Sequence, residues 1–196
     1  MSIDDFNGIL DADVAPYQRI RSFAALLARE SGLGSEGLTV VGGSALEIYT
    51  LGDYASDDID LLVEDRGRVE GVLREWGFRR KGMYWRHPRL PVLVQLVGRF
   101  DSGSRERNQV VSTSFGPVRL ASIEDILWKR VVEARAWNRP QALDEAMLAA
   151  QRYADRIDWA YVERKGRENG VADLIRDLER ATTVADDARH ARRTLA

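Results

Sequence analysis

Apolar and polar positions follow a helical period at the start of the chain and a mixed pattern after it. Ile20, Phe23, Leu26 and Leu27 recur on one side of a 3.6-residue period, which predicts an amphipathic helix over 15–29. Short apolar runs bounded by turn residues then predict strands, with two short helices between them. The predicted strands are 38–41, 58–63, 78–86, 92–97, 109–114 and 118–121, and the helices are 44–50 and 69–76.

The last third of the chain reads as helical. Ser122 begins a capping-box-like sequence, and the apolar positions after it form a stripe that is typical of a packed helix. A break at 138–140 separates this helix from three more over 141–153, 159–167 and 171–181, with Asp158 as an N-cap. We expect the residues from about Thr182 onward to form a frayed helix or a tail.

Strands first and helices last predict an α+β fold, with a small mixed β-sheet core and a C-terminal helical bundle. We expect an α/β core with its N-terminal helix over 1–121, a helical region over 122–182 packed on this core, and a tail over 183–196.

Composition narrows the class of protein. The 196 residues suit one domain, or a small α/β domain with a helical appendage, and 44% hydrophobic content is enough for a core. No apolar run reaches the length of a membrane span, and the acidic start of the chain differs from a signal peptide. The chain has no cysteine, and its two histidines do not form a zinc-type cluster. We expect a cytoplasmic protein with no membrane association.

Charge is unevenly distributed, although the net charge is only −2. Residues 1–65 hold 13 acids and 3 bases, whereas residues 66–107 hold 11 bases and 4 acids. Aromatic residues, including Trp76, Tyr84 and Trp85, are interleaved with these bases, a pattern that favours nucleic-acid binding. The alternative is that the aromatics are core residues and the arginines a solvated face, and the whole-chain pI of about 5.8 favours this alternative.

Candidate chemistry lies between residues 38 and 63. A strand leads into Gly42-Gly43-Ser44 and then a helix, an arrangement in which glycines let the backbone approach a phosphate and the helix offers free N–H groups. Asp58 and Asp60 lie two residues apart on the next strand, so they project from the same face. Two parallel carboxylates are costly unless a cation lies between them. The combination indicates phosphoryl or nucleotidyl transfer.

Each of these features also has an ordinary structural explanation. A Gly-Gly-Ser turn is a common helix start, with Ser44 as the N-cap. Acids such as Asp57 and Asp58 begin many strands after a loop, and strand parity places Asp57 on the side away from Asp58. The order strand, Gly-Gly-Ser, helix and Asp-x-Asp strand favours a site over coincidence.

These residues resemble the signature of the DNA polymerase β-like nucleotidyltransferase superfamily, and more narrowly its minimal bacterial branch that includes AbiEii-type toxins. The matching residues are Gly43-Ser44 and the run from Asp58 to Leu62. A later stretch, from Ile123 through Lys129 to Asp144, is similar in layout to the helical part of that group. The resemblance covers roughly residues 20 to 165.

The resemblance implies a Mg²⁺-dependent nucleotidyltransferase with two metal ions and an NTP such as ATP as substrate. Asp58 and Asp60 would be the catalytic, metal-binding residues, and Gly43, Ser44 and Lys129 would bind the nucleotide. The acceptor would be a hydroxyl of tRNA or a protein, in a toxin or phage-defence component with a cognate antitoxin. The alternatives are a small-molecule transferase of the antibiotic-modifying type, or a catalytically weak nucleotide- or partner-binding module.

Several positions depart from this pattern or have competing explanations. Gln95 stands where the resembling family has a third carboxylate, and Asp101 is the nearest acid beyond that strand. Lys129 is also spaced to form helical ion pairs with Asp125 and Glu133. Asp144 matches a family aspartate, but a first-turn acid is equally what a helix dipole favours. Arg135 is a weaker candidate on the same helix as Lys129.

Overall fold

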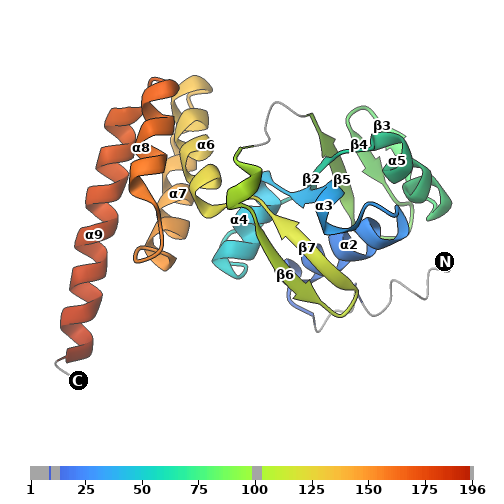
Figure 1. Ribbon diagram of the computed structural model, residues 1–196, viewed down its shortest axis with the longest axis horizontal. Helices are drawn as coiled ribbons and strands as arrows, with labels where there is room; N and C mark the ends of the chain where they lie inside the picture. The colour runs from blue at the N-terminus through green and yellow to red at the C-terminus, as the bar shows by residue number, and fades with distance from the viewer. Residues whose placement is uncertain (1–8, 10–13, 99–102, 195–196) are drawn as a thin grey trace. The chain divides into compact units, whose positions relative to one another are not determined.

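The computed structural model describes residues 9, 14–98 and 103–194, and the chain divides into two units, one ending at Ser122 and the other beginning at Ile123 (Figure 1). The first unit is built on a seven-stranded sheet in the order β3-β4-β5-β2-β1-β7-β6. Its strands are β1 (Leu38–Val40), β2 (Ile59–Val63), β3 (Arg79–Lys81), β4 (Tyr84–Arg86), β5 (Leu93–Val97), β6 (Gln109–Thr113) and β7 (Gly116–Leu120).

The sheet is mixed, as predicted. Strand β2 runs parallel to β5 and β1 runs parallel to β7, while the other neighbours are antiparallel. The helices of this unit are α2 (Pro16–Glu30), α3 (Gly34–Gly37), α4 (Gly42–Thr50), α5 (Arg66–Glu75) and the 3-10 helix η2 (Arg105–Arg107). This sheet, with the helices that follow in the second unit, confirms the predicted α+β class.

The core of the first unit lies on one face of the sheet. Along β2, Ile59, Leu61 and Val63 are buried while the residues between them are half-buried, so the predicted alternation is confirmed. Helix α2 buries the predicted apolar side, which includes Phe23. On β4, Trp85 is buried on the side of α5, where the Arg74 guanidinium lies over its ring at 5.2 Å.

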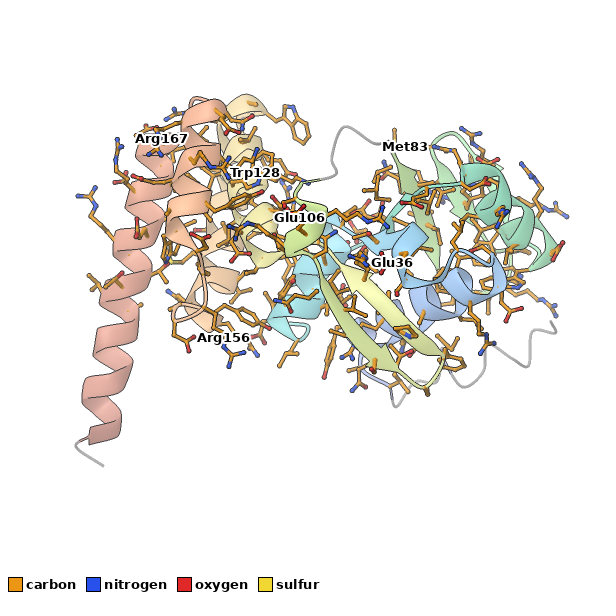
Figure 2. The ribbon with its side chains drawn as sticks, in the orientation of Figure 1. Glu36, Met83, Glu106, Trp128, Arg156 and Arg167 are labelled. Carbon is orange, nitrogen blue, oxygen red and sulfur yellow. The ribbon has the colours of Figure 1, made fainter. Side chains whose placement is uncertain are left out.

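The single strand predicted over 78–86 is wrong, because the segment forms a hairpin of β3 and β4. Gly82 has φ +64°, which lets the chain reverse at Gly82–Met83. The Met83 side chain at this turn is exposed (Figure 2). The predicted hairpin near residue 116 is confirmed as β6 and β7, but it turns at Ser114–Phe115 and Pro117 lies inside β7.

The second unit consists of α6 (Ile123–Ala136), α7 (Gln141–Arg152), α8 (Trp159–Glu168) and α9 (Ala172–Thr194). Asp158 is the N-cap of α8, as predicted, and accepts from Tyr161 N at 3.0 Å. Buried Asp125 accepts from the indole N–H of Trp128 and the hydroxyl of Tyr161, at 2.8 and 2.7 Å. Helix α9 continues past the predicted start of the tail. Over the described ranges, no helix is both long and apolar enough to cross a membrane.

Candidate functional site

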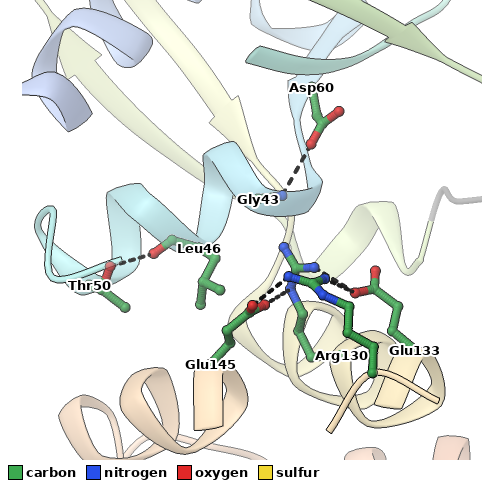
Figure 3. Close-up of polar contacts among 8 residues, drawn as sticks. Gly43, Leu46, Thr50, Asp60, Arg130, Glu133 and Glu145 are labelled. Atoms are coloured by element: carbon green, nitrogen blue, oxygen red, sulfur yellow. Dashed lines mark hydrogen bonds and ion pairs between the residues drawn. The ribbon is translucent and has the colours of Figure 1, made fainter. Parts of the chain in front are cut away.

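The turn between β1 and α4 holds Asp60. Gly42 has φ +57°, a left-handed conformation that favours glycine. A Cβ at Gly42 would also lie inside van der Waals contact with the Asp60 carboxylate. The next amide, Gly43 N–H, donates to Asp60 Oδ2 at 3.1 Å (Figure 3). A glycine is therefore needed at position 42 so that the backbone can approach the Asp60 side chain.

Ser44 links the turn to the start of β2. Its hydroxyl is fully buried, donates to the Asp58 carbonyl at 2.7 Å and accepts from the Asp60 N–H at 2.8 Å. The interpretation of Ser44 as the N-cap is wrong, because α4 begins at Gly42 and its N-cap is Val41. Ser44 thus fixes the backbone on both sides of Ile59, and its contact with a nucleotide stays a prediction.

Asp60 lies on the half-buried face of β2, whereas Asp58 precedes the strand, so a face shared by their two carboxylates stays a prediction. Asp58 lies just before β2, Asp60 lies within it, and both are half-buried on either side of buried Ile59. Burial raises the pKa of the Asp58 carboxyl above its ordinary value, and the charge of Asp57 raises it further. Asp57 itself is exposed. A cation beside Asp58 would oppose both effects, since an opposite charge favours the ionised carboxylate.

Gln95 lies beside Asp60. The two residues are partners in the parallel pairing of β2 and β5, so they occupy the same face of the sheet. Tyr84 is the partner of Gln95 on the other side, across the antiparallel pairing of β4 and β5. The neighbour of Asp60 on β5 is thus an amide, which cannot take a proton as a carboxylate would. Asp101 lies outside the described residues.

Two cavities border β2. One of about 140 Å³ lies at the N-terminal ends of β2 and β5, and its lining includes Asp57, Asp58 and Glu47. A larger one of about 290 Å³ lies further along β2, lined by Leu62, Glu64, Arg105 and other residues but by neither aspartate of the candidate site. The smaller cavity therefore adjoins Asp58 but not Asp60, and its lining includes the core residue Ile59.

Glu47 is the acid at this cavity that sequence reasoning missed. It is buried, and its Oε2 accepts from the Ser56 N–H at 2.7 Å, which ties α4 to the loop before Asp58. Burial raises the pKa of the Glu47 carboxyl. The apolar spacing of a helix start carries no signal for a buried acid, so only the fold could reveal it.

The residues present suit a magnesium ion. In the described parts of the chain, no group of three or more acids, histidines or cysteines is arranged to hold a metal. Mg²⁺ is usually held by one or two carboxylates, with water and substrate phosphates completing its coordination. Asp58 and Asp60 could supply two such carboxylates, on the side of the strand that the core leaves half-buried.

The remaining candidates lie in the second unit. Lys129 is on α6, with its ammonium 5.6 Å from the centre of the Trp128 ring. Arg135 donates to the Gly170 carbonyl and pairs with Asp173, both at 2.6 Å. Asp144 is exposed in the first turn of α7, where the helix dipole favours an acid. These contacts give Arg135 a structural role and leave the nucleotide contact of Lys129 a prediction.

Comparison with known proteins gives one distant likeness to report. No protein-family model matches the chain, and no curated protein matches it. Among solved structures, the chain is similar to the solution structure of the antibiotic-resistance factor ANT(2'')-Ia, with 16% identity and a TM-score of 0.45. The match covers 90% of this chain and 100% of that one. A likeness this distant assigns neither a family nor an activity to the chain.

Proposed function

We propose that the protein is a Mg²⁺-dependent nucleotidyltransferase, which transfers a nucleoside monophosphate from an NTP such as ATP to a hydroxyl of a macromolecular acceptor. The acceptor oxygen would form the new bond to the α-phosphorus, pyrophosphate would leave, and the hydroxyl proton would pass to water. The observation that carries this proposal is the linkage of the Gly-Gly-Ser turn to the Asp-x-Asp strand. Gly43 N–H donates to Asp60, and Ser44 bridges the backbone of Asp58 and Asp60. Three hydrogen bonds thus link the turn to the two aspartates, one to the Asp60 carboxylate and two to backbone atoms of Asp58 and Asp60.

Each residue then has a role in the transfer. Asp58 and Asp60 would hold Mg²⁺, which neutralises charge on the attacking and leaving oxygens when bound. Ser44 positions both aspartates through their backbones. The N-terminal N–H groups of α4 favour the negative charge of the triphosphate. Gln95, in register with Asp60, can orient the acceptor hydroxyl by hydrogen bonding but cannot take its proton.

Our proposal for the acceptor is tRNA or a protein. The setting suggested by the resemblance is a toxin or phage-defence component with a cognate antitoxin. A contact of Lys129 with the nucleotide phosphates, which the resemblance implies, stays a prediction.

A second candidate function rests on Gln95. Because an amide replaces the family's third carboxylate beside Asp60, the protein would bind nucleotide with little or no transfer. This nucleotide-binding module would keep the contacts of the turn and the two aspartates. The two functions differ in turnover and agree in nucleotide binding.

The proposal is tested by incubating the purified protein with each α-labelled NTP, Mg²⁺ and total cellular RNA or protein. The wild type should label a macromolecule, and Asp60→Asn should abolish labelling while keeping an acceptor for Gly43 N–H. Nucleotide binding without labelling in any fraction would support the binding module instead. Absence of both would contradict the two candidates together.

A further inference from the structure

A row of paired residues runs across the sheet from Asp60 to its edge. The row consists of Asp60 on β2, Gln95 on β5, Tyr84 on β4 and Lys81 on β3. Residues paired in register point to the same face, so all four lie on the face opposite buried Trp85. Three strand spacings separate the ends of the row, a distance of about 14 Å.

The same face carries further positive charge at the edge. Arg79 and Arg86 are partners in the β3–β4 hairpin, each two residues from Lys81 or Tyr84 and therefore on their side of the sheet. Arg79, Lys81 and Arg86 are all exposed. Half-buried Tyr84 lies between this basic edge and Gln95.

Ion pairing separates the two faces of β3. Arg80 projects to the opposite face and lies 3.7 Å from Glu70, which also pairs with Arg66 and Arg74. By contrast, within residues 14–98 and 103–194 no ion pair includes any of the three bases on the Asp60 side. The positive charge on the α5 side is thus partly neutralised within the protein, and the charge on the Asp60 side is left for a partner.

Edge protection alone does not account for this difference. Basic residues on an edge strand oppose pairing with another sheet, but that role does not depend on which face they occupy. Uncompensated bases on one face, beside an aromatic ring that lies in line with Asp60, match the needs of a single-stranded nucleic acid.

We propose that Arg79, Lys81, Arg86 and Tyr84 form an acceptor surface that binds a single-stranded end of RNA. The bases would contact phosphates, Tyr84 would stack on a nucleobase, and the terminal hydroxyl would lie toward Gln95 and Asp60. This inference rests on the proposed function, because it makes the RNA end the acceptor of the nucleotidyl group.

The test measures RNA binding in the absence of NTP and Mg²⁺. Fluorescence anisotropy monitors the binding of a labelled single-stranded RNA of about 20 nucleotides. Arg79→Glu/Lys81→Glu should weaken binding by about tenfold or more. The slope of log K against log salt concentration should become less steep by about 1.4, the value expected for two lost phosphate contacts. The matched control is Arg80→Glu on the other face of β3, which should change Kd less than about twofold because Arg80 makes none of the proposed phosphate contacts. Tyr84→Leu should weaken binding about fivefold or more with an unchanged salt slope.

The contrary outcomes are distinct. The inference is overturned by wild-type protein that does not bind RNA at low salt, by an Arg80→Glu loss equal to that of the double variant, or by polyglutamate that competes as well as RNA. The last result would indicate an acidic protein partner. If the charge-reversal variant does not fold, Arg79→Gln/Lys81→Gln replaces it. The rise in melting temperature on addition of Mg²⁺ and NTP is measured in parallel. If the wild type shows no rise, the result counts against the proposed function and not against RNA binding.

Discussion

Asp60 and Gln95 are in-register partners on the adjacent parallel strands β2 and β5, so a carboxylate and an amide lie side by side on one face of the sheet. Strand alternation alone left the direction of Gln95 open, and the register places it beside Asp60. Gln95 therefore occupies the neighbouring-strand position at which the resemblance implies a third carboxylate.

Gln95→Glu should strengthen metal binding. The substitution is nearly isosteric and adds an oxygen ligand and a base beside Asp60. We expect a lower Kd for Mn²⁺, used as a titratable substitute for Mg²⁺, and faster label transfer. Gln95→Met is the matched control, which keeps the volume without adding charge. A folded Gln95→Glu protein with unchanged metal binding and transfer would contradict the place given to Gln95.

Gly42→Ala should destabilise the protein and disturb the site. The left-handed φ of Gly42 costs an alanine about 1–2 kcal/mol, and the new Cβ would push against the Asp60 carboxylate. Chemical denaturation measures the change in the free energy of unfolding. Gly71→Ala is the control, because a Cβ at Gly71 in α5 meets nothing within 4 Å. That substitution should be neutral or stabilise by about 0.5–1 kcal/mol, and an equal loss in both variants would argue against a special role for Gly42.

Ser44→Ala should cost about 1–3 kcal/mol of unfolding free energy, because the buried N–H of Asp60 loses its acceptor. Ser31→Ala is a suitable comparison. The Ser31 hydroxyl donates to the Ala28 carbonyl, which also accepts from Leu33 N–H and so stays satisfied. Equal costs for the two serines in urea denaturation would show that the bridge between Asp58 and Asp60 adds no stability.

The spacing of apolar and polar residues along the chain predicted the buried faces of individual strands and helices. The alternation predicted the correct face for each residue from Ile59 to Val63, because β2 buries one side only. The 3.6-residue period of α2 likewise predicted the side of this helix that is buried. The β3–β4 turn was missed because each strand has only three residues and Gly82 is its one turn signal.

Features that depend on contacts between distant parts of the chain could not be predicted from the sequence. The pairing of Asp60 with Gln95 follows from the strand order, which no local pattern specifies. The bridging role of Ser44 and the burial of Glu47 likewise arise only once α4 lies against β2. The site residues could thus be nominated from sequence, whereas their contacts could not.

Glu47→Gln should stabilise the protein more at neutral than at acidic pH. Burial raises the folded-state pKa of Glu47 above its ordinary value of 4.5, so the folded protein binds this proton more tightly than the unfolded chain. The Glu47 contribution to stability therefore falls as pH rises from 4.5 through the folded-state pKa, and stays low above it. Glutamine does not ionise and can still accept from Ser56 N–H.

The measurement is the melting temperature of both proteins between pH 4.5 and 8. The variant should gain about 2–4 °C at pH 8 for each kcal/mol of relieved cost, and the gain should shrink toward pH 4.5. Asp58 titrates in both proteins, so its effect cancels in the difference. A gain that is independent of pH would contradict the burial of an ionised Glu47.

The central claim is that Asp58 and Asp60 together hold a cation that binds with a nucleotide. The most direct measurement is the shift in melting temperature on addition of Mg²⁺ and NTP, since a ligand that binds the folded state raises it. We predict a shift in the wild type and in Asp57→Asn, because Asp57 is exposed and strand alternation predicts that its side chain points away from the cation. The shift should disappear in Asp58→Asn/Asp60→Asn, and a double variant that keeps the full shift would contradict the account.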